Sequence, residues 1–107
     1  MRDDDIREMF SGLGPVTIKR MFGGKGIYYS GLIIALEVDG EILLKADETT
    51  KADFAGAGSH QWHYEGKKSG APVAMPYWAI PDEAIDDPET FGIWARKAYE
   101  ASLRSRK

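Results

Sequence analysis

Apolar residues recur with helical spacing near the start of the chain. Ile6, Met9, Phe10 and Leu13 follow the i, i+3, i+4, i+7 pattern, which predicts a short amphipathic helix. Three aspartates precede this stripe, and carboxylates favour the first turn of a helix. The pair at 14–15, Gly-Pro, ends the pattern because neither residue continues a helix well.

The C-terminal segment predicts a longer helix. Asp87 can cap its first turn, and Pro88 suits the first helical position. An apolar stripe follows and should dock this helix on the core. Its residues are Phe91, Trp94, Ala95, Ala98 and Ser102.

The middle of the chain is rich in β-branched and other apolar residues. Strands are predicted at 16–22, 26–30, 32–38 and 41–46, followed by a polar helix-like stretch at 47–54 and two more strands at 61–65 and 73–80. Pro76 has no N–H to donate, so its strand should lie at a sheet edge or carry a bulge. The pattern predicts a single α+β domain with N-terminal, middle and C-terminal helices.

The stretch Val38-Asp39-Gly40-Glu41 predicts a β-hairpin, because Asp-Gly readily adopts the positive φ values of a two-residue type I′ turn. This register places apolar residues on both faces. One face holds Ile34, Leu36, Val38 and Leu43; the other holds Ile33, Ala35, Ile42, Leu44 and Ala46. Either helices cover both faces or the register differs, or else the first face is a dimer or partner surface.

Composition narrows the function classes. A chain of 107 residues holds one core, and a net charge of −3 with a pI near 5.3 disfavours non-specific nucleic-acid binding. No cysteine is present, which excludes disulfides, thiolate nucleophiles and cysteine zinc sites. No apolar run approaches the roughly 20 residues of a membrane span. We expect a cytoplasmic protein that does not associate with membranes.

Candidate catalytic residues are few. His60 and His63 are three apart in a predicted strand, so their rings should point to opposite faces and not share a metal. The acidic residues at 82–89 are typical of a solvated turn and a helix N-terminus. No serine occupies a nucleophile elbow. We expect no enzyme activity, cofactor or metal.

The stretch RMFGGKGIYYSG, residues 20–31, is the most motif-like part of the chain. It lacks the hydroxyl residue and the glycine spacing of a phosphate-binding loop, and only part of it fits an RNA-recognition strand. We interpret it as a hairpin or bulged bend. Its glycines would supply positive φ and close backbone approach, and Phe22 would pack inward.

Basic residues support an alternative function. Lys67 and Lys68 lie in one loop, and Arg104, Arg106 and Lys107 lie at the C-terminus. Together with Lys25 they could form a weak nucleic-acid accessory surface if the fold brings them together. Binding of that kind would weaken steeply as salt rises.

Two segments resemble a known family. "RMFGGKGIYYSGLIIALEVDGEILLKAD" and "MPYWAIPDEAIDDPETFGIWARKA" are similar to the N-terminal domain of the TfoX/Sxy regulators of bacterial competence. The motif residues are Arg20, Met21, Phe22, Gly23, Gly24 and Gly26, then Met75, Pro76, Tyr77, Trp78 and Pro81. The resemblance runs from about Ile6 almost to the C-terminus. It implies a two-layer α+β fold, similar to type III secretion chaperones, with a mostly antiparallel sheet of about five strands.

The resemblance also implies a task without catalysis. In the two-domain regulators this domain promotes expression of DNA-uptake genes, acting through other transcription factors. We therefore expect a stand-alone, TfoX-like interaction or regulatory domain. It should bind a protein partner, form a homodimer and use the sheet face or the motif residues for these contacts.

Overall fold

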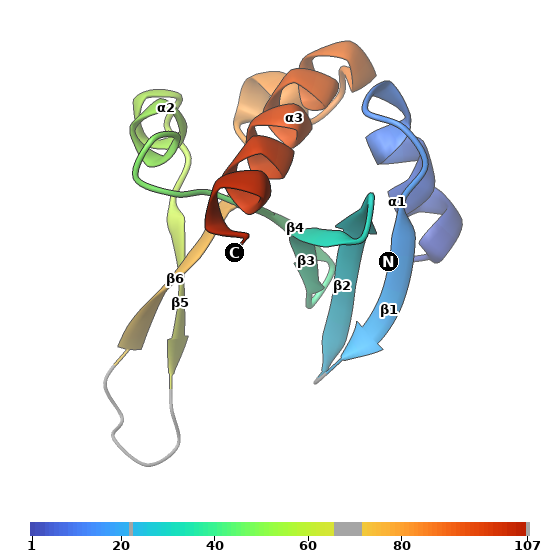
Figure 1. Cartoon of the computed structure of the whole chain (residues 1–107), viewed down its shortest axis with the longest axis horizontal. Helices are drawn as coiled ribbons and strands as arrows, with labels where there is room; N and C mark the ends of the chain where they lie inside the picture. The colour runs from blue at the N-terminus through green and yellow to red at the C-terminus, as the bar shows by residue number, and fades with distance from the viewer. Residues whose placement is uncertain (22, 66–71, 107) are drawn as a thin grey trace.

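The computed structural model describes residues 1–21, 23–65 and 72–106 (Figure 1). Helices and strands follow one another along the chain in the order predicted from the sequence. They are α1 (Asp3–Met9), η1 (Phe10–Gly12), β1 (Thr17–Met21), β2 (Gly24–Tyr29), β3 (Leu32–Val38), β4 (Glu41–Lys45), α2 (Lys51–Gly56), β5 (Gln61–Glu65), β6 (Pro72–Ala79), η2 (Asp82–Ala84) and α3 (Pro88–Ser105).

The described strands form one antiparallel sheet in the order β1-β2-β3-β4-β6-β5. The α+β class is confirmed, with six strands instead of about five. α1 and α3 lie over one face of the sheet (Figure 1). The β5–β6 hairpin extends beyond the helix layer as a separate arm.

The main core lies between these helices and the sheet. Ile6, Phe10 and the predicted stripe of α3 are buried. The rings of Phe10 and Phe91 meet edge to face with centroids 4.9 Å apart. Gly12 and Gly92 let η1 and α3 approach closely, because a Cβ added at Gly92 would lie 3.1 Å from the carbonyl carbon of Gly12.

Local signals position the start of α3 as predicted. The Asp87 side chain accepts a hydrogen bond from the N–H of Glu89 at 3.1 Å and so caps α3, and Pro88 starts that helix. The middle helix is shorter than the predicted 47–54 stretch. Asp47 instead accepts bonds from the N–H groups of Thr49 and Thr50, and this turn delays the helix until residue 51.

The predicted hairpin is confirmed. Asp39 and Gly40 both have positive φ, and Leu36 pairs with Leu43. The face assignment is wrong for Ile34, which is completely buried beneath the helices. A bulge between β2 and β3 sets two residues of β3 against one of β2 at this point, which reverses the alternation. Ile33 therefore lies on the open face instead of the helix face.

Pro76, which has no N–H to donate, lies in an irregular part of the β5–β6 pairing. β6 lies inside the sheet, between β4 and β5, but its pairing with β5 is interrupted between Gln61 and His63. The predicted bulge is therefore confirmed. The side-chain amide of Gln61 donates to the Met75 carbonyl at 2.9 Å, a side-chain bond across the irregular part of the ladder.

Candidate functional site

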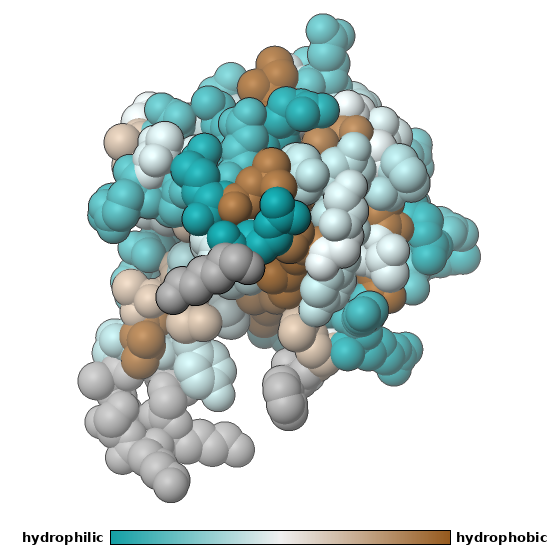
Figure 2. Space-filling view, viewed as in Figure 1, coloured by the Kyte–Doolittle hydropathy of each residue, from teal (hydrophilic) through white to brown (hydrophobic). Residues whose placement is uncertain are grey.

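An apolar groove runs along the open face of the sheet, opposite the helix layer. Its volume is about 390 Å³. Figure 2 shows the molecule hollowed below its middle, between the β1–β2 and β5–β6 hairpins, while polar side chains cover much of the helix layer. The lining residues are Met21, Gly24, Lys25, Ile33, Leu36, Glu37, Val38, Trp62, Tyr64, Met75 and Tyr77.

The floor of the groove is a second, smaller core. Leu43 is only 1% exposed, and Tyr77 and Ala79 are also buried. None of the described helices provides this cover; the side chains of Trp62 and Met75 pack against the floor from within the sheet. Of the predicted dimer face, Leu36 and Val38 are half-buried in the groove and Leu43 lies beneath its surface.

The two sequence motifs meet in this groove. Met21 and Gly24 of the first motif and Met75 and Tyr77 of the second line the same surface, although more than fifty positions separate them in the chain. β6 pairs with β4, so the contact between the motifs depends on a pairing between strands that are not consecutive.

The glycines of the first motif have the structural roles predicted for them. Gly23 has φ +70° in the turn between β1 and β2. A Cβ at Gly24 would lie 2.2 Å from the Glu37 carbonyl oxygen, and a Cβ at Gly26 would crowd Met21 and Tyr28 on the open face. The inward packing predicted for Phe22 lies outside the described residues.

The remaining motif residues lie elsewhere. Arg20 is exposed and lines a shallow hollow with Glu37 beside the groove. Trp78 faces the helix layer, where its ring lies 6.2 Å from that of Phe54. Pro76 is exposed, and Pro81 is fully buried. The motifs therefore combine groove residues with residues that serve the main core.

Tyr77 gives the groove floor an uncharged polar group. Burial raises the pKa of its phenol, and the neighbouring Tyr28 raises it further. The Tyr28 ring in turn lies under the ammonium group of Lys19, with Nζ 5.0 Å from the ring centroid. Tyr77 therefore stays protonated at neutral pH and contributes an apolar ring with a single hydroxyl.

Lys25 anchors the start of α1. Its Nζ donates to the Asp3 carboxylate and to the Met1 carbonyl, both at 2.6 Å. The Asp3 pKa is lowered, chiefly by this hydrogen bond. The buried Glu37 carboxylate lies 3.2 Å from the Met1 amine. Both hydrogen bonds of Lys25 are to partners within its own chain, so this lysine has a structural role.

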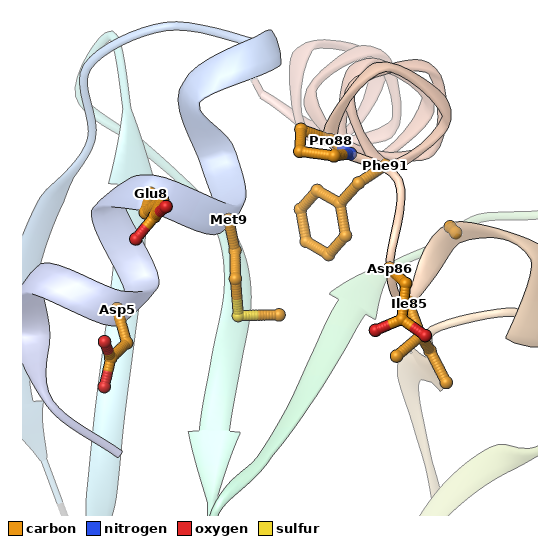
Figure 3. A pocket seen from close by; sticks show the side chains of 8 residues that line it. Asp5, Glu8, Met9, Ile85, Asp86, Pro88 and Phe91 are labelled. Atoms are coloured by element: carbon orange, nitrogen blue, oxygen red, sulfur yellow. The ribbon is translucent and has the colours of Figure 1, made fainter.

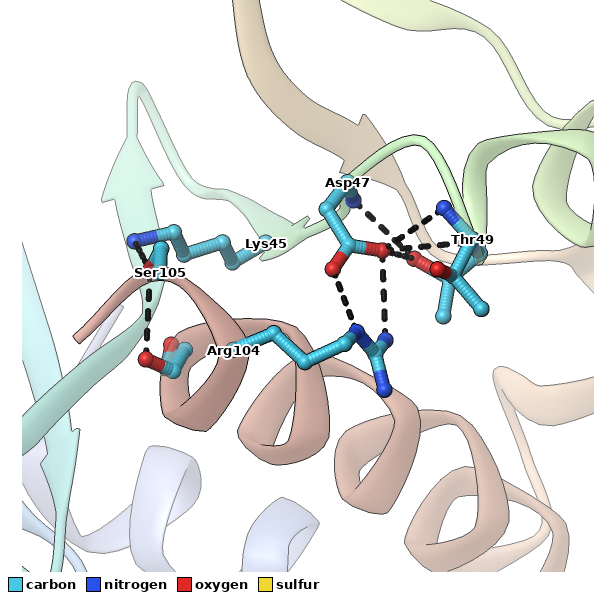
Figure 4. Close-up of polar contacts among 7 residues, drawn as sticks. Lys45, Asp47, Thr49, Arg104 and Ser105 are labelled. Atoms are coloured by element: carbon cyan, nitrogen blue, oxygen red, sulfur yellow. Dashed lines mark hydrogen bonds and ion pairs between the residues drawn. The ribbon is translucent and has the colours of Figure 1, made fainter. Parts of the chain in front are cut away.

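Arg104 makes a further internal ion pair, with Asp47 (Figure 4). Its Nε donates to Asp47 Oδ2 at 2.6 Å, and Lys45 reaches Ser105 at 3.2 Å. The sequence-based nucleic-acid surface is therefore partly occupied by internal contacts. Its members Lys67, Lys68 and Lys107 lie outside the described residues.

Replacing Asp47 with asparagine should make stability less sensitive to acid. Hydrogen bonds from Arg104 and Thr50 lower the Asp47 pKa from 3.8 to about 2, so the charged form stabilises the fold at neutral pH and this contribution disappears as pH falls from about 4 towards 2. We expect Asp47→Asn to cost about 1–2 kcal/mol at pH 7 and almost nothing near pH 2. Urea unfolding across this pH range measures the difference.

The exposed carboxylate of Glu41 provides the control for this experiment. Glu41→Gln should change stability by no more than about 0.5 kcal/mol at any pH. An equal loss in the two variants, or a constant loss for Asp47→Asn down to pH 2, would contradict the role given to Asp47.

An acidic hollow lies between α1 and the start of α3 (Figure 3). Asp5, Glu8 and Asp86 surround Met9 and Phe91 there. The described part of the chain contains no group of three or more histidine or acidic side chains placed to hold a metal. The hollow is therefore the polar rim of the main core, where carboxylates sit near two helix starts.

Comparison with known proteins agrees with the resemblance carried by the two motifs. The family model described as TfoX N-terminal domain matches residues 8–102, nearly the whole chain. A search of curated proteins finds no match. Among the described residues, no helix is long and apolar enough to cross a membrane.

Proposed function

Because the chain belongs to the TfoX N-terminal domain family, which is linked to competence regulation, we propose that it is a regulatory interaction domain. Its apolar groove would bind a segment of a partner protein without chemical transformation. The observation that carries this proposal is the convergence of both motifs on one groove, which no helix in the described ranges covers.

The lining of the groove suits a polypeptide partner. Aromatic residues and methionine are enriched in protein interfaces, and methionine adapts to irregular apolar surfaces. Trp62, Tyr64, Tyr77, Met21 and Met75 supply both kinds of side chain. The charged groups at the groove, Lys25 and Glu37, already have internal partners, so they add little that would attract a charged small molecule.

A protein partner also explains regulation better than direct nucleic-acid binding. The chain carries a net charge of −3, and Lys25 and Arg104 are engaged in ion pairs. We propose that the domain acts in the cytoplasm, changes gene expression through another regulatory protein, and self-associates.

The test compares binding by wild-type protein with binding by two arginine variants. Met75→Arg places a charge in the groove, whereas Ile93→Arg alters an exposed position on α3. Proteins captured from the native cell are identified, purified and titrated. We expect Met75→Arg to weaken binding at least about tenfold, because a desolvated charge costs more than 1.4 kcal/mol.

Ile93→Arg should bind like wild type, since its side chain lies outside the groove. Equal affinities for all three proteins would remove the groove from the proposal. Circular dichroism and thermal unfolding of each variant establish that a loss of binding does not come from unfolding.

A further inference from the structure

The two edges of the sheet differ in how they are protected. Native proteins discourage pairing at a sheet edge with charged side chains, proline or bulges. β1 carries the exposed cations Lys19 and Arg20 along its short length. From Gln61 to Tyr64, β5 carries no lysine, arginine, carboxylate or proline; its one charged residue is Glu65 at its end, and the bulge in the β5–β6 pairing belongs to β6. β5 is therefore the edge open to another strand.

The side chains of β5 are suited to pairing with an identical strand. Trp62 and Tyr64 both line the groove, with ring centroids 6.2 Å apart, and Tyr64 is 51% exposed. His63 lies between them, is exposed and is not part of the groove lining. If two β5 strands pair antiparallel about His63, each Trp62 faces the Tyr64 of the other copy. Aromatic pairs of this kind stabilise antiparallel strands.

We infer that two copies of the chain associate through β5, antiparallel and about a two-fold axis at His63, to form one continuous sheet. The two-fold makes the contact self-complementary, so each Trp62–Tyr64 pair occurs twice. The sequence-predicted dimer face is a poorer candidate, because Ile34 and Leu43 are buried within their own chain. β5 instead is the last strand of the described sheet, with no described strand beyond it.

Association of two copies through β5 also enlarges the apolar groove. Trp62 and Tyr64 of β5 form one wall of the groove. In the dimer, Trp62 and Tyr64 of the second copy extend that wall beyond the two-fold axis. Two grooves then share one aromatic surface. This consequence for partner binding rests on the proposed function; the dimer itself does not.

Cysteine cross-linking tests the geometry directly, because the chain has no cysteine of its own. Directly opposed residues in antiparallel strands have Cα atoms about 4.5–5.5 Å apart, within the range of a disulfide. Under mild oxidation His63→Cys should convert mostly to a covalent dimer. Thr17→Cys, exposed on the β1 edge, should stay monomeric.

Sedimentation equilibrium provides the second measurement. Wild-type protein should dimerise at tens of micromolar, and His63→Lys should raise the dissociation constant about tenfold by placing like charges opposite each other. His60→Lys, the same change just before β5, should match wild type. If His63→Lys unfolds, the cross-linking result decides the question.

A monomeric wild type, or equal cross-linking of the two cysteine variants, would overturn the β5 dimer. The Met75→Arg experiment measures partner binding and the cysteine cross-linking measures self-association, so the two results are read separately although Met75 packs in the same cluster as Trp62. A cross-linked His63→Cys protein together with unchanged partner binding by Met75→Arg would remove only the proposed function.

Discussion

Replacing Phe91 with alanine should lower the free energy of unfolding by about 3–5 kcal/mol. The side chain is only 2% exposed and its ring packs edge to face on Phe10, so the substitution removes an aromatic contact and leaves a cavity between α3 and η1. Domains of this size are stable by about 5–15 kcal/mol. Urea unfolding, followed by tryptophan fluorescence, should show a much lower midpoint with a similar slope.

Ile93→Ala is the matched control on the same helix. Ile93 is 58% exposed, and its truncation should change stability by less than about 0.5 kcal/mol. The packing described for α3 would be wrong if both alanine variants unfolded at the same urea concentration.

Replacing Gly24 with alanine should cost about 3 kcal/mol, at the upper end for overpacking. The added Cβ would lie 2.2 Å from the Glu37 carbonyl oxygen. Because this oxygen belongs to the backbone of the neighbouring strand, relief requires β2 and β3 to separate. Thermal unfolding should show a fall in Tm of at least about 10 °C.

Gly26→Ala tests whether the effect comes from the backbone contact. Its Cβ would meet the Met21 sulfur at 3.0 Å and the Tyr28 ring at 3.1 Å, and such side chains can move. We expect a loss of at most about 1 kcal/mol. A larger loss for Gly26→Ala than for Gly24→Ala would mean that side-chain crowding beside Met21 and Tyr28, and not the approach of the strands, explains the motif.

Local signals in the sequence predict much of this fold. Asp39-Gly40 defines a hairpin because the turn fixes its own backbone geometry, and Asp87-Pro88 defines the start of α3 through a cap that involves adjacent residues. Ile34 shows where such reasoning ends. The burial of Ile34 depends on a bulge in the pairing of β3 with β2. The alternation of apolar and polar residues within β3 carries no information about how that strand pairs with its neighbour.

The groove could not be predicted from any single segment of the sequence. The motifs identify Met21 and Met75, but the meeting of these residues depends on the pairing of β6 with β4. Trp62 and Tyr64 were missed. The signal for them was present, since these aromatics alternate with Gln61 and His63, but only the position of β5 at the edge gives that alternation a functional meaning.

The close crossing of η1 over α3 has a consequence for synthesis of the chain on the ribosome. Gly12 meets Gly92, so the helix layer cannot close until α3 has emerged. Until then the apolar side of the strands remains exposed, as happens in folds dominated by contacts between distant segments. Nascent chains that end before α3 should therefore be held by chaperones, and release should coincide with the appearance of α3.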